Sequence, residues 1–403
     1  MSILASFLKD QNIIALLKNS SRAQQGSIAR SITILSLAVA LGSYAVHTVV
    51  SGRYVREVFL NNDFNFEAAL GKTFDLWLLT DSTNQDLINT PKLRSLITKN
   101  LAVDVKQYTP RVVEHLIIAA HEMLGDIEGS KEIPHLYPLM QHMVAIAGAS
   151  IFVGPKLAKN KDLVETFKNL AIDIGKYGKA INKHRKHLYH ALSPEIDERL
   201  AKMEKGGDWE RPQDLLQSVI ETLQLTSNHP HRYMLPVQYF LALVFASIHT
   251  TSENATITMY RLLQHPEAIE PLLEEQQQVL EKHYGPNFDD SDMTKLFTGE
   301  VVKDFTRLDS LCRETMRVRN FYLELPHTYL GKSRFTMSNG AVIHPGDDVI
   351  INAYTNHTNP EIQCDGVGDY HEFKPFRFVE KGRQATRVGD DFLFFGQGQH
   401  ACP

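Results

Sequence analysis

The chain has 403 residues, of which 43% are hydrophobic, 22% charged and 9% aromatic, and this composition excludes a disordered or low-complexity protein. Lys and Arg number 42 against 47 Asp and Glu, so the formal net charge of −5 gives no basis for a nucleic-acid partner. The cysteines are Cys312, Cys364 and Cys402, which excludes a disulfide-built scaffold and favours a reducing compartment.

The N-terminal end leaves two interpretations open. Residues 1–30 form a polar segment with four basic residues and one acidic residue, and residues 31–51 contain no Asp, Glu, Lys or Arg. The second stretch is long enough to cross a bilayer, but its Ser, Thr, Gly and His residues weaken that interpretation. It is either a membrane anchor or a core segment of the fold. The basic residues before it favour a cytosolic N-terminus.

The middle of the chain has a helical pattern. From residue 91 onward, apolar residues recur at three- and four-residue spacing. Thr109-Pro110 and Asn160 to Asp162 are typical of helix starts. Residues 191–214 are charged and rich in turn formers, which predicts an exposed connection with its break at Gly206-Gly207.

A central helix and a small β part follow. The strongly apolar run 234–248 is short for a membrane span, so we expect a helix buried at the centre of a large domain. Residues 334–356 hold Asn-Gly and Pro-Gly turns between short β-prone runs, which predicts an antiparallel hairpin unit. The last thirty residues show little periodicity and are expected to be irregular. Together these features predict one mainly α domain with a minor antiparallel β part.

The strongest chemical signal stands at the C-terminal end, where Phe395, Gly398 and Cys402 have the spacing FxxGxxxC. Gly396 and Gly398 allow a loop to turn tightly beneath a planar cofactor. Such a loop aims backbone N–H groups at a thiolate, which lowers its basicity and tunes the metal that it binds. His400 is placed to donate to a carboxylate of that cofactor. A buried structural cysteine is the alternative that this motif alone leaves open.

Three further segments carry weaker signals. Glu314 and Arg317 share one face of a helix, although an exposed ion pair explains that spacing equally well. Residues 372–380 combine aromatic and basic side chains, which is also typical of a surface loop. In residues 246–251, Ala-Ser-Ile-His-Thr-Thr, the threonines can bond to carbonyls one turn earlier and open the helix locally, or they are ordinary core threonines.

Taken in chain order, these four segments resemble the signatures of cytochromes P-450, the haem-thiolate monooxygenases. The matching stretches are ASIHTT, ETMR, FKPFRF and FGQGQHACP. The stretches RLDSLCRETMRV and SNGAVIHPGDDVIINAYTNHTNP extend the resemblance, which covers roughly residues 45–403 and is greatest to fungal members that act on terpenoids and indole-diterpenes. It implies the cytochrome P-450 fold and a catalytic domain over residues 52–403.

The resemblance implies a haem group and assigns residues to it. Cys402 would be the axial thiolate ligand of the haem iron, with electron donation that favours O–O cleavage. Phe395 would shield the thiolate and Gly398 would shape the loop. His400 would lie near a propionate, and Arg94 would be the helix arginine that contacts a propionate.

The resemblance also implies catalytic and folding roles. Thr250 would help to deliver protons to bound dioxygen, together with Thr251 and His249. His249 stands where the family usually has Asp or Glu, and a histidine relays protons near neutral pH. An ion-pair network with a folding role would hold the cysteine loop: Glu314, Arg317 and Arg377.

The implied reaction inserts one oxygen atom of O₂ into an apolar, terpenoid-like small molecule in fungal secondary-metabolite biosynthesis. Electrons must come from outside, because the chain has no GxGxxG fingerprint and no room for a fused flavin domain. An NADPH-cytochrome P-450 reductase is therefore the implied partner, on the cytosolic face of the endoplasmic reticulum membrane. A haem-thiolate isomerase or dehydratase, which needs no reductase, is a further possibility.

The sequence departs from the family at both ends. The family motif continues past Cys402 with a helix and a terminal β segment, so we expect an incomplete catalytic domain. Two hypotheses follow: an active monooxygenase, or a truncated, catalytically inactive remnant that does not hold haem. Family anchors leave the N-terminus in the lumen, whereas the basic residues before Ser31 favour the cytosol.

Overall fold

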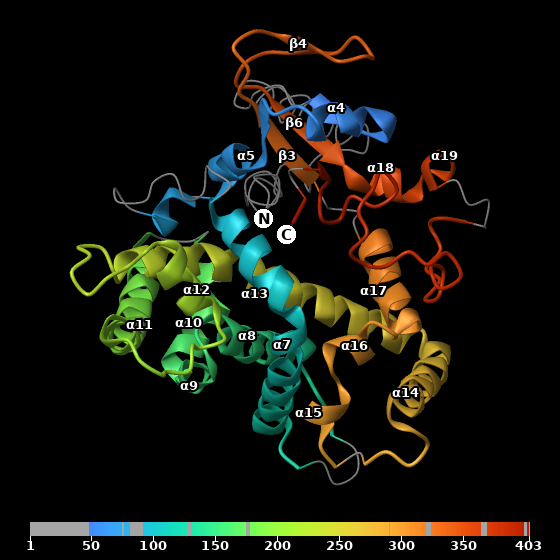
Figure 1. Ribbon diagram of the computed structural model, residues 1–403. Coiled ribbons are helices and arrows are strands. Elements are labelled where there is room, and N and C mark those ends of the chain that lie inside the picture. The colour runs from blue at the N-terminus through green and yellow to red at the C-terminus, as the bar shows by residue number, and fades with distance from the viewer. Residues whose placement is uncertain are drawn as a thin grey trace, which may run out of the picture.

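The computed structural model describes residues 48–74, 76–80, 92–126, 131–174, 178–289, 291–319, 324–363, 369–398 and 401–402. It has a helical part and a smaller part built on a four-stranded sheet, and the red C-terminal segment runs between the two (Figure 1). The α-helices are α4 (Val55–Phe59), α5 (Phe66–Thr73), α7 (Lys92–Leu124), α8 (Leu136–Phe152), α9 (Pro155–Ala158), α10 (Lys161–Ile174), α11 (Gly178–Lys205), α12 (Leu215–Thr222), α13 (Met234–Gln264), α14 (Ile269–Tyr284), α15 (Met293–Leu296), α16 (Gly299–Val302), α17 (Thr306–Arg319), α18 (Ala353–Thr358) and α19 (Pro360–Gln363).

The sheet combines two strands from the start of the described chain with two strands that follow the helical part. Its strands lie in the order β1 (Thr48–Val50), β6 (Asp348–Asn352), β3 (Glu324–Tyr329) and β2 (Phe64–Asn65). β1 runs parallel to β6, whereas β3 is antiparallel to both of its neighbours. The expected hairpin within 334–356 is confirmed, because β4 (Phe335–Thr336) and β5 (Val342–Ile343) pair antiparallel. β6 instead enters the larger sheet.

The apolar stretch 31–51 lies largely outside the described residues. Thr48–Val50 forms β1, with Val50 buried against the sheet part of the core. Residues 31–47 of that stretch, like the polar segment 1–30, lie outside the described residues.

The core of the helical part forms around α13, as expected for the apolar run 234–248. Val237, Phe240, Val244 and Ile248 are buried, and α8, α10 and α11 pack against this helix. Within the described residues, α13 is the one helix that is long and apolar enough to cross a membrane, and more than half of its most apolar stretch is buried in the protein.

The helix start expected at Thr109-Pro110 is wrong, because α7 continues through Pro110. Tyr108 and His115 on either side of the proline are buried, and Arg111 donates to the carbonyl of Ser150 at 3.2 Å. Packing against α8 therefore holds the helical conformation that proline disfavours, at the cost of a bend between the cyan and teal halves of the helix (Figure 1).

The exposed connection expected over 191–214 is wrong for its first part, because α11 runs through Pro194 to Lys205. Leu192, Ile196 and Leu200 stand four residues apart and are buried, so an apolar stripe persists beneath the charged residues. The expected break at Gly206-Gly207 is confirmed, since both glycines have positive φ angles of 65° and 94°. The helix start at Asn160 is confirmed too, because its side chain accepts from Leu163 N at 3.1 Å.

Candidate functional site

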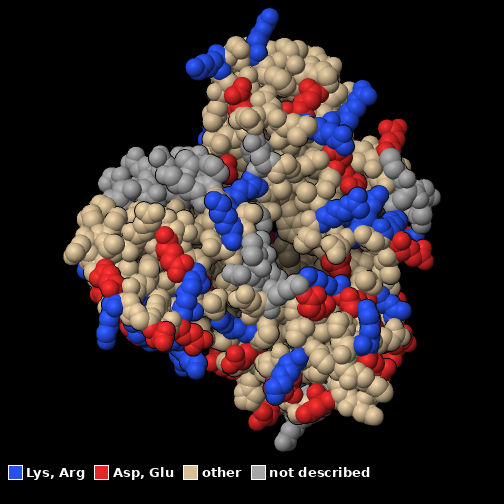
Figure 2. Space-filling model, viewed as in Figure 1, with Lys and Arg blue, Asp and Glu red and all other residues tan. Residues whose placement is uncertain are grey.

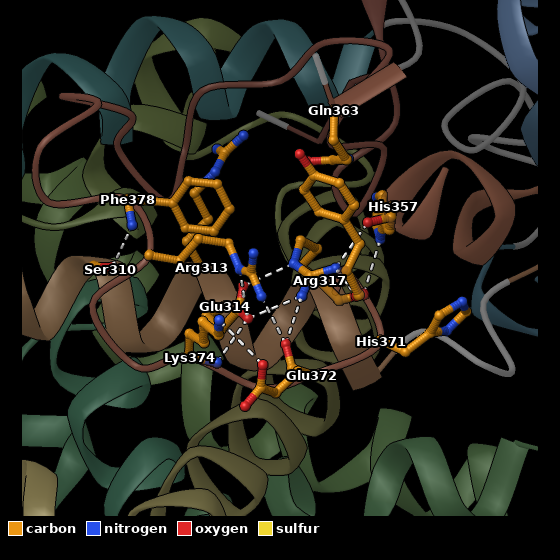
Figure 3. Close-up of polar contacts among 12 residues, drawn as sticks. Ser310, Arg313, Glu314, Arg317, His357, Gln363, His371, Glu372, Lys374 and Phe378 are labelled. Atoms are coloured by element: carbon orange, nitrogen blue, oxygen red, sulfur yellow. Dashed lines mark hydrogen bonds and ion pairs between the residues drawn. The ribbon is translucent and has the colours of Figure 1, made fainter. Parts of the chain in front are cut away.

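A buried carboxylate on α17 is the centre of the most connected part of the structure. Glu314 has no exposed surface, and its two oxygens accept from Arg317 Nε at 2.7 Å and Arg317 Nη2 at 2.8 Å. The same carboxylate accepts from Arg377 Nε at 3.0 Å and from the backbone N–H of Lys374 at 2.9 Å. Figure 3 shows these contacts converging on Glu314. An exposed ion pair, one of the two interpretations of the sequence, is thereby excluded.

The two arginines extend the network to backbone carbonyls. Arg317 Nη1 donates to the carbonyls of His357 at 2.8 Å and Tyr370 at 2.6 Å. Arg377 Nη2 donates to the carbonyl of Glu372 at 2.8 Å. Each buried charge is therefore both paired and hydrogen-bonded, which is the condition under which such charges are tolerated.

The same face of α17 fixes the irregular segment that follows residue 369. Ser310 Oγ donates to the carbonyl of Pro375 at 3.0 Å and accepts from Phe378 N at 3.0 Å. Arg313 donates to the carbonyls of Gln384 and Arg387, both at 2.7 Å. A segment without regular secondary structure thus takes its shape from side chains one helical turn apart.

The expected cysteine loop has the tight turns that its glycines predict. Gly396 and Gly398 have φ angles of 71° and 60°, in the region that favours glycine. A Cβ on Gly398 would lie 3.4 Å from the carbonyl oxygen of Phe59, so the loop also passes close to the backbone that follows α4. The N–H of Cys402 donates to the carbonyl of Phe395 at 2.6 Å, which closes the turn.

The thiol of Cys402 combines accessibility with an apolar environment. Its side chain is exposed, yet desolvation raises the pKa of the thiol, and the positive charge of Arg94 partly opposes that shift. Figure 2 shows the face of the molecule that is seen in Figure 1, which is hollowed near its centre and has Lys and Arg side chains on several sides. The other described cysteine, Cys312, is half-buried, and burial raises its pKa to about 11.

The middle of α13 leaves a stripe uncovered, although the N-terminal half of the helix is mostly buried. Ala246, Thr250 and Glu253 are exposed and stand on one face, whereas Ser252 and Thr256 on the opposite face are buried. The hydroxyl of Thr250 donates to the carbonyl of Ala246 at 2.8 Å, as expected for a threonine that bonds back by one turn. Its oxygen lone pairs remain available to a group on the exposed side.

His249 points to α8 and has a phenol as its partner. The hydroxyl of Tyr137 lies 2.8 Å from His249 Nδ1, and the rings meet edge to face at 5.8 Å. Gln141 Nε2 donates to the same hydroxyl at 3.4 Å and to the carbonyl of Lys168 at 2.9 Å. The Tyr137 hydroxyl therefore contacts both Gln141 and His249, and it fixes the orientation of the imidazole. Burial raises the pKa of Tyr137, and the charge of Glu253 adds to the rise.

The comparisons with known proteins agree with this geometry. A family model described as "Cytochrome P450" matches residues 156–403. The chain belongs to the cytochrome P450 family. The expected fold and the expected enzyme class, an oxidoreductase of the P450 monooxygenase type, are thereby confirmed.

Similar P450s come from fungi. Cytochrome P450 monooxygenase 71 of Postia placenta is 27% identical over 363 residues, which cover 81% of this chain and 67% of that protein. Cytochrome P450 monooxygenase 110 of the same fungus is 27% identical over 395 residues, with 88% and 73% covered. Among solved structures, retinoic acid bound cyanobacterial CYP120A1 has a TM-score of 0.60 at 19% identity and covers 88% of this chain and 77% of that chain.

Most of the residues expected in this P450 site are described. Phe395 packs edge to face on Phe394 at 4.9 Å, within a cluster that includes Met316 and Phe392. Arg94 lies on α7, close enough to Cys402 for its charge to act on the thiol. Thr251 is exposed beside Thr250. His400 lies outside the described residues.

Two parts of the site were missed in the sequence. Tyr137 lies more than a hundred residues before His249, so only the packing of α8 on α13 brings them together. His357 and Asn356 follow β6 in the short helix α18, and both are fully buried. The signal for them was a run of polar residues, Thr355 to Asn359, two residues after an apolar strand.

Proposed function

We propose that this P450 is a haem-dependent monooxygenase that inserts one oxygen atom of O₂ into an apolar, terpenoid-like small molecule in fungal secondary metabolism. The observation that carries the proposal is the accessible but desolvated thiol of Cys402, within the electrostatic reach of Arg94 and on a loop that follows the segment held by the buried Glu314 network. A thiol of this kind binds a soft metal centre by giving up its proton.

The described residues fit a haem-thiolate site. Cys402 would supply the sulfur that holds the iron, Gly396 and Gly398 would give its loop the tight turns that leave room for the group, and Arg94 would bind a propionate through its guanidinium group. Bound haem supplies the activation of O₂ by iron, which no side chain in this site provides.

The chain's own residues would position substrate and protons. Thr250 is held by its bond to Ala246, so its oxygen presents lone pairs to the uncovered side of α13 and can accept and pass on a proton there. His249, oriented by Tyr137, would supply that proton from the α8 side, with Thr251 beside the route. Phe395 would keep water from the sulfur by its packing against Phe394.

Electrons would come from an NADPH-cytochrome P450 reductase, because P450 monooxygenases need a redox partner besides O₂. We place both proteins on the cytosolic face of the endoplasmic reticulum membrane. Because Thr48–Val50 pairs with β6 in the sheet, the anchor would lie within the uncharged residues that precede β1, and the catalytic domain would begin at β1. The support for this arrangement is the uncharged composition of that stretch.

The test is a carbon monoxide difference spectrum of the reduced, haem-loaded chain and of two cysteine variants. The wild-type chain and Cys312→Ala should show the red-shifted thiolate band, and Cys402→Ser should lose it, because a hydroxyl is a poor ligand for this role. A thiolate band that survives in Cys402→Ser, or a wild-type chain without the band, would overturn the proposal. Product formation that depends on NADPH, reductase and O₂ would then separate a monooxygenase from an isomerase or dehydratase.

A further inference from the structure

A second buried histidine connects α17 to the cysteine loop. His357 lies in α18 and has no exposed surface. Its Nδ1 is 3.1 Å from the carbonyl oxygen of Arg317, and its Nε2 accepts from the N–H of Leu393 at 2.7 Å. Its ring stacks on Phe392 at 5.4 Å with an interplanar angle of 17°. Figure 3 shows His357 beside Arg317.

This geometry permits one protonation state. A carbonyl oxygen only accepts, so Nδ1 must carry the proton that it shares with Arg317. An N–H group only donates, so Nε2 must be unprotonated to accept from Leu393. The ring is therefore neutral and has a single tautomer, and each nitrogen satisfies a backbone group of a different segment.

The backbone group that His357 satisfies stands at the entrance of the cysteine loop. The carbonyl of Leu393 accepts from Gly396 N at 2.9 Å, and the N–H of Cys402 donates to the carbonyl of Phe395 at 2.6 Å. The neighbouring residue Asn356 binds the chain three residues before Leu393, because its Nδ2 donates to the carbonyl of Asp390 at 2.9 Å. A short path of hydrogen bonds thus runs from α17 through α18 to the first turn of the loop.

We propose that His357 is a positioning residue for the Cys402 loop: its imidazole connects the carbonyl of Arg317 to the N–H of Leu393 and so fixes where the loop starts relative to α17. The proposal rests on the proposed function only in making Cys402 the haem ligand. The Glu314 network fixes residues 370–377, whereas His357 fixes the later segment that leads into Phe395.

Two amide substitutions of different length separate this role from simple packing. In His357→Asn the amide extends about as far as Nδ1, so it can keep the bond to the Arg317 carbonyl but cannot reach the N–H of Leu393. In His357→Gln the amide extends about as far as Nε2, so its oxygen can accept from Leu393. Leu fills a similar volume and keeps neither bond. The matched control is His115→Leu, because His115 is also buried but its Nδ1 bonds to Arg111 within α7.

The experiment measures two quantities on the full chain. Hydrogen exchange of the Leu393 amide, read by fragmentation mass spectrometry, should accelerate about tenfold or more in His357→Asn and His357→Leu, and by much less in His357→Gln. His115→Leu should leave this amide at the wild-type rate. In the haem-loaded chain, the fraction of the thiolate band in the carbon monoxide spectrum should fall in the same order.

Equal exchange in the Asn and Gln variants, or a Leu variant with wild-type protection, would overturn the proposal and leave His357 a packing residue. If the Leu variant does not fold, the comparison of Asn with Gln decides. If even the wild-type chain lacks the thiolate band but the exchange rates follow the expected order, the proposed function fails while the positioning role of His357 stands.

Discussion

Thr250 and Thr256 make the same kind of bond within α13, but they face different surroundings. The exposed hydroxyl of Thr250 bonds to the carbonyl of Ala246, and Thr256 bonds to the carbonyl of Ser252 on the buried face. We expect Thr250→Val to lower the rate of product formation about 100-fold, because a general acid or base in place contributes on that order. Thr256→Val is the matched control. Equal rates of product formation in the two variants would contradict the proton-handling role.

Glu314 carries a prediction on stability. Glu314→Gln removes the charge that compensates two buried guanidinium groups. We therefore expect the free energy of unfolding to fall by about 3–5 kcal/mol, and we expect the variant to retain less haem than the wild-type chain. Asp304→Asn removes a carboxylate that pairs with Lys282 and His283 at the surface and should cost less than about 1 kcal/mol. Urea unfolding of both variants measures the difference. Similar losses would show that the buried network contributes no more than an exposed pair.

His357 carries a prediction on pH. Burial lowers the pKa of His357 from 6.5 to about 3; the hydrogen bond to Arg317 opposes the shift, and the charges of Arg317 and Arg313 add to it. The unfolded chain therefore binds a proton at this position between about pH 6.5 and pH 3 that the folded chain does not bind. The free energy of unfolding should therefore decrease as the pH is lowered through this window. The decrease should be less steep in His357→Gln, which has no titratable group at this position. Parallel curves for the two proteins would contradict this.

At the scale of elements, the sequence predicted the end of a helix correctly where the chemistry of one or two residues determines that end. Asn160 accepts from Leu163 N, and Gly206 and Gly207 have positive φ angles, so local chemistry was enough at both places. Pro110 and Pro194 misled because packing against other helices outweighs the local cost of a proline inside a helix. The cysteine loop was identified from its motif, whereas Tyr137 and His357 depend on contacts that sequence spacing does not reveal.

One buried ion pair joins three helices and is open to test. Arg199 on α11 donates to both oxygens of Asp214 at 2.6 and 2.7 Å, and Asp214 also caps α12 by accepting from Gln217 N at 2.9 Å. A Cβ on Gly154, just before α9, would lie 2.7 Å from the same carboxylate. Removal of Asp214 would leave the buried Arg199 with Glu195 as its remaining carboxylate partner, whose Oε1 accepts from Arg199 Nε at 3.0 Å.

We expect Asp214→Ala to lower the free energy of unfolding by about 3–5 kcal/mol, because the cap is lost as well as the ion pair. Glu198→Ala, which removes an exposed partner of Lys156 and Lys202, should cost less than about 1 kcal/mol. Thermal unfolding monitored by circular dichroism distinguishes the two. A small loss in Asp214→Ala would mean that the three helices are held by their apolar contacts alone.

At the scale of the whole molecule, the site lies between a helical part that is continuous in sequence and a sheet part that is not. The helices α7 to α17 come from one run of chain, whereas the sheet takes β1 and β2 from before that run and β3 and β6 from after it. Asn356 adds to this closure: it accepts from the N–H of Gly52, 304 residues away, at 2.7 Å. α17 and the cysteine loop are thus anchored on both parts.

This closure sets an order of events during synthesis on the ribosome. β1 leaves the exit tunnel early, but its partner β6 is translated only after the whole helical part. The apolar contacts among α8, α10 and α13 can form meanwhile, since they close far shorter loops. In pulse-labelled hydrogen exchange on stalled nascent chains, we expect amides of α13 to be protected before those of β1, and β1 to become protected only once residue 352 has emerged. Until then β1 lacks the strand with which it pairs and presents unpaired backbone groups, the kind of surface that chaperones cover, and Cys402, the proposed haem ligand, is translated later still.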